Sequence, residues 1–296
     1  MGGENWKRVI VYISAVLVFL FTFGPFVGVF LASIVPETAL ITRPPAWFSK
    51  GFTLANYRYI FTGDIPKGFA TKGTARSRVS QEALQIPRTL ANSFIIAFGT
   101  MLVNLIFGSM AAFAYSRLRF PGRGETFMFI LLSRLIPLVA LAVPYYLIIQ
   151  TLGLLDTFWS LIMIHSVLTL PFTILILTVY FRGIPEDLED QALVDGCNQF
   201  QMFLRVIIPL SLPSLVAAAL FSFMLSYSEF LFGLLISSTT STKPISVVLS
   251  SLSNNPDVSI SLLNSSIIVA IIPSIILAIV VWRFVIQDLI LGALKG

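Results

Sequence analysis

Long runs of uncharged residues divide the chain. There are 28 uncharged residues between Arg8 and Glu37, and another 28 between Arg88 and Arg117. A helix needs about 20 apolar residues to cross the hydrocarbon core of a bilayer. Because backbone groups in lipid must pair within their own segment, and the apolar runs do not alternate, helices are expected rather than a barrel. The pattern predicts six transmembrane helices, over residues 9–34, 90–115, 126–149, 158–181, 213–236 and 264–286.

Composition agrees with this pattern. The chain has 296 residues, of which 56% are hydrophobic and 11% are charged, whereas an ordinary soluble domain is about 25% charged. This balance excludes an ordinary soluble enzyme and a disordered chain. A single cysteine, Cys197, and a single histidine, His165, exclude a disulfide framework and the common zinc sites with several histidines. The sequence therefore predicts an all-α integral membrane protein, with one transmembrane domain over residues 1–296 and no catalytic or metal-binding residues.

The distribution of basic residues predicts the orientation of the spans. Lys7 and Arg8 precede the first span, and three arginines lie in the loop 116–125, whereas the short turn 151–157 has no basic residue. Short basic loops stay on the cytoplasmic side, so both termini are expected to be cytoplasmic. A signal peptide is the alternative interpretation of the first span, but its apolar run is longer than a typical signal core.

The predicted outer loop, residues 36–88, does not fit this charge rule. It holds eight basic and three acidic residues, a balance of +5. Long loops cross a membrane largely regardless of charge, so the predicted topology stands. Two interpretations remain open: the bases contact anionic lipid headgroups, or the loop docks an external protein. The second predicts a role in association kinetics for Lys67, Lys72, Arg76 and Arg78.

The predicted cytoplasmic loop 182–212 has the pattern of two short helices joined by a turn. Pro185 suits a first helical turn, and four acidic residues follow it, which is favourable near a helix N-terminus. Gly196 is placed to end the first helix in a left-handed turn. Phe200, Phe203 and Leu204 give the second arm an apolar stripe. So many apolar side chains in a short polar loop suggest a surface that docks on another protein.

This loop resembles the EAA loop in the membrane subunits of ABC importers. The resemblance is carried by Glu189 to Gly196, followed by Ile207-Ile208-Pro209-Leu210. Further segments resemble the maltose-type second permease subunit in the same order along the chain. They are Asn92-Ser93, Ala111 to Gly122, Gly153-Leu154-Leu155-Asp156-Thr157, Ser228-Glu229-Phe230 and Gly292-Ala293-Leu294-Lys295-Gly296.

The resemblance implies a type I ABC importer permease, with six spans and a cytoplasmic coupling loop in the prokaryotic inner membrane. Its expected partners are a second permease subunit, an ATPase dimer that carries ATP and Mg²⁺, an external solute-binding protein and membrane lipid, with no nucleic acid and no cofactor on this chain. The expected solute is a carbohydrate or polyol. The tail 287–296 is expected to reach the ATPase through Gly292, Lys295 and Gly296. The expected ATPase-coupling residues are Glu189, Asp190, Ala192, Asp195, Gly196, Phe200, Phe203 and Pro209.

Two charges lie inside predicted spans, where charge is costly and usually faces a cavity or a partner. Glu229 is expected either to line the solute pathway or to pair with Arg134 or a backbone group. Arg134 is expected to reach toward the membrane surface. His165 is expected to be a hydrogen-bonded packing residue. Tyr145 and Tyr227 join Glu229 as candidate pathway residues because a buried hydroxyl needs a partner.

The main alternative is a six-span secondary transporter or channel. It would need internal repeats or coupling-ion charges near the membrane midplane, and the sequence has no recognisable repeat. It would also leave the 182–212 motif without a role. The sequence has no G-x-x-x-x-G-K-[ST] phosphate-binding loop, so we expect a transport subunit that does not itself hydrolyse ATP.

Overall fold

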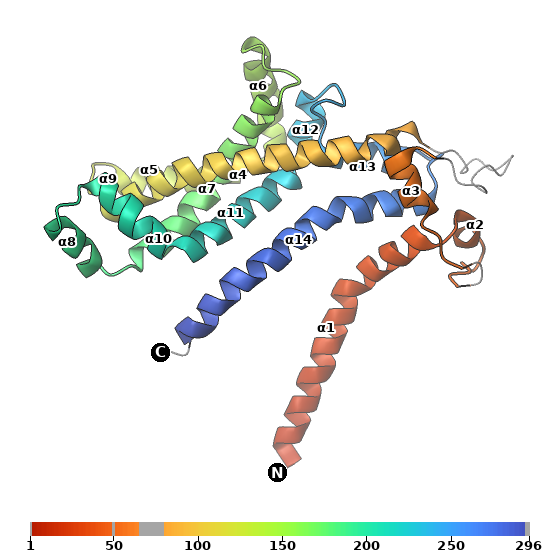
Figure 1. Ribbon diagram of the computed structural model, residues 1–296, viewed down its shortest axis with the longest axis horizontal. Coiled ribbons are helices and arrows are strands. Elements are labelled where there is room, and N and C mark those ends of the chain that lie inside the picture. Colours follow the sequence, from red (N-terminus) through yellow and green to blue (C-terminus); the bar gives the residue numbers. More distant parts are fainter. Residues whose placement is uncertain (1, 49–50, 65–79, 294–296) are drawn as a thin grey trace. The chain divides into compact units, whose positions relative to one another are not determined.

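The computed structural model describes residues 2–48, 51–64 and 80–293. In these ranges every regular element is helical and no strand is present, which confirms the all-helical prediction (Figure 1). Four helices are long and apolar enough to cross a membrane, over residues 6–34, 81–117, 158–182 and 260–280. Two bent helix pairs raise this number to six if each pair is one span. The basic residues Lys67, Lys72, Arg76 and Arg78 lie outside the described residues.

Two of the predicted spans are not continuous helices. The predicted helix 126–149 is instead α5 (Arg123–Leu132) and α6 (Leu138–Thr151), which are bent by 101° across a short 3₁₀ turn. Pro137, directly before α6, lacks a backbone N–H and so cannot continue the helical ladder. The predicted helix 213–236 is divided into α11 (Leu212–Tyr227) and α12 (Leu231–Ile236). Both predictions of a single helix were therefore wrong.

The chain forms two compact units. One comprises residues 1–87 with 248–272, and the other comprises residues 88–247 with 273–296. The remaining helices of the described chain are α1 (Gly2–Ile34), α2 (Glu37–Leu40), α3 (Ala55–Thr62), α4 (Ile86–Arg117), α7 (Phe158–Arg182), α8 (Asp187–Val194), α9 (Gln199–Met202), α10 (Ile208–Leu210), α13 (Ile245–Asn254) and α14 (Ile260–Ala293).

The first unit is held together around Ser33 at the end of α1. The Ser265 hydroxyl of α14 donates a 2.9 Å hydrogen bond to the Ser33 carbonyl, and the Tyr57 and Ser33 hydroxyls lie 2.7 Å apart. The Glu37 carboxylate accepts a 2.9 Å hydrogen bond from the Ser261 backbone N–H. These contacts connect the C-terminal end of α1 to α3 and to the first two turns of α14.

In the second unit, α4 and α11 pack against α7. Gly108 lets α4 approach α7 closely, because a Cβ at this position would lie only 2.7 Å from Thr173 Cγ2. The fully buried Asn104 side chain of α4 donates hydrogen bonds to Thr169 on α7 (2.5 Å) and to Ser222 on α11 (2.8 Å). Small residues and interhelical hydrogen bonds of this kind hold helices together in lipid, where there is no hydrophobic driving force. The packing of α4, α7 and α11 positions the two candidate sites that are described below.

Candidate functional site

The 182–212 segment folds as the two-armed helical structure that its spacing predicted. Helix α8 ends before Gly196, whose φ of +84° is the left-handed conformation expected for this glycine. The second arm begins with a capping box, in which the Asn198 and Gln201 side chains each bond the other's backbone N–H. This arm continues from α9 through a π-helical turn, Phe203–Ile207, into α10. The arm then meets α11 at a bend of 82°.

The inner face of the segment is anchored on the helices of the second unit. Ala192, Phe203 and Ile207 are buried in one apolar cluster with Phe113 of α4 and Phe181 of α7. The rings of Phe113 and Phe203 have their centroids 5.1 Å apart. Phe203 was predicted to belong to a docking surface together with Phe200 and Leu204, and that grouping was wrong. A helix buries one side only, and Phe203 lies on the buried side.

A buried ion pair reinforces this anchor. Glu189 of α8 pairs with Arg117 at the end of α4, and the two side chains are 11% and 8% exposed. Arg117 also donates a 2.6 Å hydrogen bond to the Ile184 carbonyl at the start of the segment. Burial raises the pKa of the Glu189 carboxyl, Arg117 only partly offsets this, and the neighbouring Glu186 and Asp190 charges raise it further. Glu189 therefore faces inward, toward α4, and not outward toward a partner.

Other side chains of the same segment are exposed, and several of them are large and apolar. Val194 is 87% exposed and Phe200 is 60% exposed. Leu188, Leu193 and Leu204 extend the same exposed set, and the predicted coupling residues Asp190, Asp195 and Pro209 are also exposed. We call Leu188, Leu193, Val194, Phe200 and Leu204 the outer apolar face. Large apolar side chains that are exposed on two adjoining short helices are candidates for an interaction surface.

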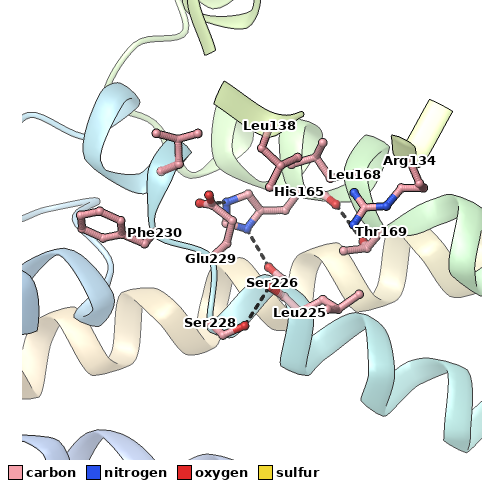
Figure 2. Close-up of a pocket in the computed structure, with 11 residues that line it drawn as sticks. Arg134, Leu138, His165, Leu168, Thr169, Leu225, Ser226, Ser228, Glu229 and Phe230 are labelled. Carbon is pink, nitrogen blue, oxygen red and sulfur yellow. Dashed lines mark hydrogen bonds and ion pairs between the residues drawn. The ribbon is translucent and has the colours of Figure 1, made fainter. Parts of the chain in front are cut away.

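A second candidate site is a cavity of about 370 Å³ inside the second unit. Its lining comes from the bend between α5 and α6, from α7, and from the break between α11 and α12 (Figure 2). Most of the lining is apolar, and the charged or titratable members are Arg134, His165 and Glu229. The two helix breaks that hydropathy did not predict are thus the places that open this cavity.

The Glu229 carboxylate is held by the protein from several sides. It accepts hydrogen bonds from the backbone N–H groups of Phe232 (3.0 Å) and Gly233 (3.2 Å) in the first turn of α12. His165 Nε2 lies 3.1 Å from the same carboxylate, and Figure 2 shows the two side chains pointing toward each other. His165 Nδ1 lies 2.8 Å from the Ser226 hydroxyl, and the ring is 1% exposed. His165 is therefore the hydrogen-bonded packing residue that was predicted, with an acidic partner that the sequence did not reveal.

Arg134 occupies a different part of the cavity wall. The carbon of its guanidinium group lies 4.9 Å from the centroid of the Phe172 ring, a cation–π contact. No hydrogen bond or ion pair joins its side chain to any other described residue, and its Nε is buried. The predicted pairing of Glu229 with Arg134 was wrong, whereas the alternative, pairing with backbone groups, is confirmed. Arg134 lines the cavity and lies over Phe172, where a reach toward the membrane surface had been expected.

The two tyrosines predicted beside Glu229 do not line this cavity. Tyr145 packs edge-on against Phe232, with ring centroids 5.6 Å apart. Tyr227 is 8% exposed and stacks on Phe223 at 5.7 Å. Of the predicted pathway residues, only Glu229 lies at the cavity. In the tail, Gly292 lies within α14, and Lys295 and Gly296 lie outside the described residues.

At the end of α7 opposite the 182–212 segment, a group of hydrogen bonds that we call the outer tie joins the turn before α7 to the segment after α12. Asp156 accepts hydrogen bonds from the Ser238 and Thr239 backbone N–H groups, at 3.0 and 3.1 Å, and from the Thr239 and Thr242 hydroxyls. Burial alone would raise the pKa of Asp156, but these four donors lower it to about 2. The backbone of Asp156 has a φ of +57°, a conformation that Asn and Asp tolerate better than most residues.

Sequence reasoning missed three pairings: Arg117 with Glu189, His165 with Glu229, and Asp156 with Thr239 and Thr242. In each case the partners lie far apart along the chain, so spacing carries no signal. The only available signal was charge inside or beside an apolar run, which had marked Glu229 without identifying its partner.

The comparisons with known proteins agree on a transport family. Residues 104–291 match the family model described as the binding-protein-dependent transport system inner membrane component. The chain is 28% identical to the sulfoquinovosyl glycerol transport system permease protein SmoH of Agrobacterium fabrum, over 96% of this chain and 93% of that protein. It is 30% identical to the trehalose transport system permease protein SugB of Mycobacterium tuberculosis, over 92% of each chain.

A solved structure shares the fold. It is a chain of a bacterial ABC transporter involved in the import of the acidic polysaccharide alginate, with a TM-score of 0.74. The likeness covers 94% of this chain and 97% of that chain, at 21% sequence identity. This chain therefore shares the fold of that transporter chain over nearly its whole length.

Proposed function

Because this chain belongs to the family of binding-protein-dependent transport system inner membrane components, we propose that it forms half of the translocation pathway for a carbohydrate in an ABC importer. The functions of its relatives, transport of trehalose and of sulfoquinovosyl glycerol, support a sugar-containing solute. The family supports this function over a secondary transporter or channel. A second permease subunit supplies the other half of the pathway, and an external binding protein delivers the solute.

In this proposal α5 with α6 forms one span and α11 with α12 forms another, which together with the four long apolar helices gives six spans with both termini in the cytoplasm. The 182–212 segment and the tail then lie on the same side as the ATPase dimer, which binds ATP and Mg²⁺. The outer loop 36–88 faces the binding protein. The supporting observations are the basic residues near the N-terminus and in the loop 116–125.

The observation that carries the proposal is the division of the 182–212 segment into two faces. Its inner face is fixed to α4 by a buried ion pair and an apolar cluster. Its outer face exposes Val194 and Phe200. A segment built in this way transmits force, because a protein bound to the outer face displaces the core helices along with it. We propose that the outer apolar face seats the segment in a groove of the ATPase subunit.

Co-purification with the ATPase tests this assignment. The complex should be isolated through a tag on this chain, with Val194→Ser and Phe200→Ser combined in one variant. Loss of most of the bound ATPase is expected, since well-packed apolar anchors dominate interface energy. Gln199→Ser is the matched control, because Gln199 is an exposed neighbour of Phe200 on the same helix. Retention of ATPase by the double variant, or equal loss in the control, would contradict the proposed docking surface.

A further inference from the structure

The cavity between α7 and the two helix breaks is lined by two charged side chains, and only one of them has hydrogen-bonding partners. The Glu229 carboxylate is already bonded to two backbone N–H groups and to His165. The Arg134 guanidinium has no hydrogen-bonding or ionic partner in the described part of the chain. In Figure 2, Arg134 lies apart from the Glu229–His165 pair. Arg134 is therefore the charged side chain of the lining whose N–H donors remain free to bind a molecule inside the cavity.

The position of Arg134 suits recognition of an anion. Its guanidinium carbon lies over the Phe172 ring, and a cation–π contact of this kind provides no acceptor atom for the N–H groups. These N–H groups form a planar fork that matches carboxylate, sulfonate and phosphate oxygens in pairs. The surrounding leucines, Leu138, Leu168 and Leu231, are apolar walls that strengthen the field of a charge in the cavity.

The rest of the lining suits a sugar. Phe230 is an aromatic member of the lining and is 37% exposed. Ser228, which is exposed, supplies a hydroxyl group. An unpaired charge inside a span is costly, and such charges usually mark a substrate path. Resting on the proposed carbohydrate transport, we propose that this cavity receives an anionic group of the solute, a sugar carboxylate, sulfonate or phosphate, with Arg134 as its counter-charge.

The field in the cavity can be measured on the isolated full-length chain. Cys197 is the only cysteine, so Cys197→Ser with Ser228→Cys places a single thiol at the cavity. Its reaction rates with an anionic (sulfonatoethyl) and a cationic (trimethylammonioethyl) methanethiosulfonate are compared. Arg134→Gln should lower the anionic-to-cationic rate ratio by about tenfold, as expected for one charge across several ångströms of partly apolar medium. Arg134→Lys should retain most of the ratio, and the exposed Arg205→Gln should leave it unchanged.

The same thiol reports the class of solute. D-Glucuronate and D-glucose have similar size and differ in charge. Glucuronate should slow modification of the thiol, glucose should not, and Arg134→Gln should abolish the glucuronate effect. A rate ratio that is unaffected by Arg134→Gln would overturn the proposal, as would equal protection by glucose. An absence of glucuronate protection in the parent chain, the result expected if Arg134 binds a lipid phosphate instead, would also overturn it.

These rates require neither the ATPase nor transport. Failure of the ATPase co-purification would therefore count against the proposed function alone. A chain that binds its ATPase but shows no charge selectivity in the cavity would count against this inference alone.

Discussion

Two carboxylates flank helix α7, and their surroundings are opposite in kind. Glu189 follows α7 and forms a buried ion pair with Arg117. Asp156 precedes α7 and has no cationic partner among the described residues, only two backbone N–H groups and two hydroxyls. Yet the pKa of Glu189 is raised, whereas that of Asp156 is lowered to about 2.

The difference shows that the surroundings of a carboxylate matter more than the formal charge of its partner. Removing Glu189 from water disfavours its ionised form more than one arginine favours it, and two acidic neighbours add to the effect. Asp156 stays closer to solvent and has four donors directed at it, so its ionised form is preferred. The Arg117–Glu189 pair that anchors the 182–212 segment is therefore sensitive to pH and to the loss of its arginine. The hydrogen bonds of Asp156 in the outer tie keep that carboxylate ionised over a wider pH range.

Breaking the Arg117–Glu189 pair on one side should have the largest effect. Arg117→Met leaves Glu189 buried without its counter-charge and should cost about 3–5 kcal/mol of stability. Adding Glu189→Leu should recover most of that loss, because a buried ion pair is often no better than an apolar pair. Thermal unfolding of the purified chain in detergent, followed by tryptophan fluorescence, measures both. Arg205→Met, at an exposed arginine, is the control.

The loss in Arg117→Met should also depend on pH. A raised folded-state pKa means that protonated Glu189 favours the folded state at low pH, and that this contribution disappears as the pH rises through the raised value. The defect of Arg117→Met should therefore shrink as the pH is lowered toward 4.5, the ordinary pKa of glutamate. A defect that is the same at pH 7 and at low pH, or that is matched by Arg205→Met, would contradict the pairing.

Glu229 offers an intermediate case, because both backbone donors and a basic ring hold its carboxylate. Glu229→Leu removes the acceptor for the Phe232 and Gly233 N–H groups and for His165. Unsatisfied buried donors should cost about 2–3 kcal/mol. Glu229→Gln keeps one acceptor oxygen and should lose less than half as much. Equal losses in the two variants, measured by the same thermal unfolding, would show that charge alone, and not backbone capping, is what Glu229 supplies.

The sequence predicted what local pattern determines. The left-handed turn at Gly196 and the helix before it follow from an acidic first turn and a terminal glycine, and both are present. Uncharged runs located the apolar helices, but they did not show where helices break, because the residues around Ser228 are nearly as apolar as their neighbours. Pro137, which cannot continue the helical ladder, is the residue in the sequence that marks the other break.

The cavity could not be predicted in the same way. Its lining is assembled from three separate segments, and hydropathy treats Arg134, His165 and Glu229 as unrelated interruptions. Which side of a short amphipathic helix is buried was equally undetermined, since Phe200 and Phe203 are chemically identical. Only packing against Phe113 decides that Phe203 is the buried one.

The Gly196 turn offers a smaller perturbation of the segment that Arg117 anchors. Gly196→Val forces a β-branched residue into a left-handed conformation, a strain of about 1–2 kcal/mol. Gly196→Asn is the matched control, because Asn tolerates this region. Protease cleavage within residues 182–212 should quicken in the valine variant, and solute-stimulated ATPase activity of the assembled complex should fall. Normal coupling and normal cleavage in Gly196→Val would show that the turn geometry is not required.

The smallest expected effect is at the outer tie, and it has the opposite pH dependence. Asp156→Asn preserves the favourable φ and an acceptor for the Ser238 and Thr239 N–H groups, so it should cost less than about 1 kcal/mol at pH 7. Asp156→Ala loses all four hydrogen bonds and should cost more. Because the folded-state pKa is depressed, ionised Asp156 stabilises the fold above its ordinary value of 3.8. That contribution is lost as the pH falls toward about 2.

Thermal unfolding midpoints measured between pH 5 and pH 2 test the direction of this pH dependence. That range covers the ordinary aspartate pKa of 3.8 and the lowered Asp156 pKa of about 2. The parent chain should lose more stability across that range than Asp156→Asn, whose amide does not titrate. The two curves should converge at the acid end, since a protonated carboxyl and an amide offer similar hydrogen bonds. If the asparagine variant shows the parent's acid profile, Asp156 is not the titrating group. The contrast between Asp156, held by neutral donors, and Glu189, held by an arginine, would then fail for Asp156.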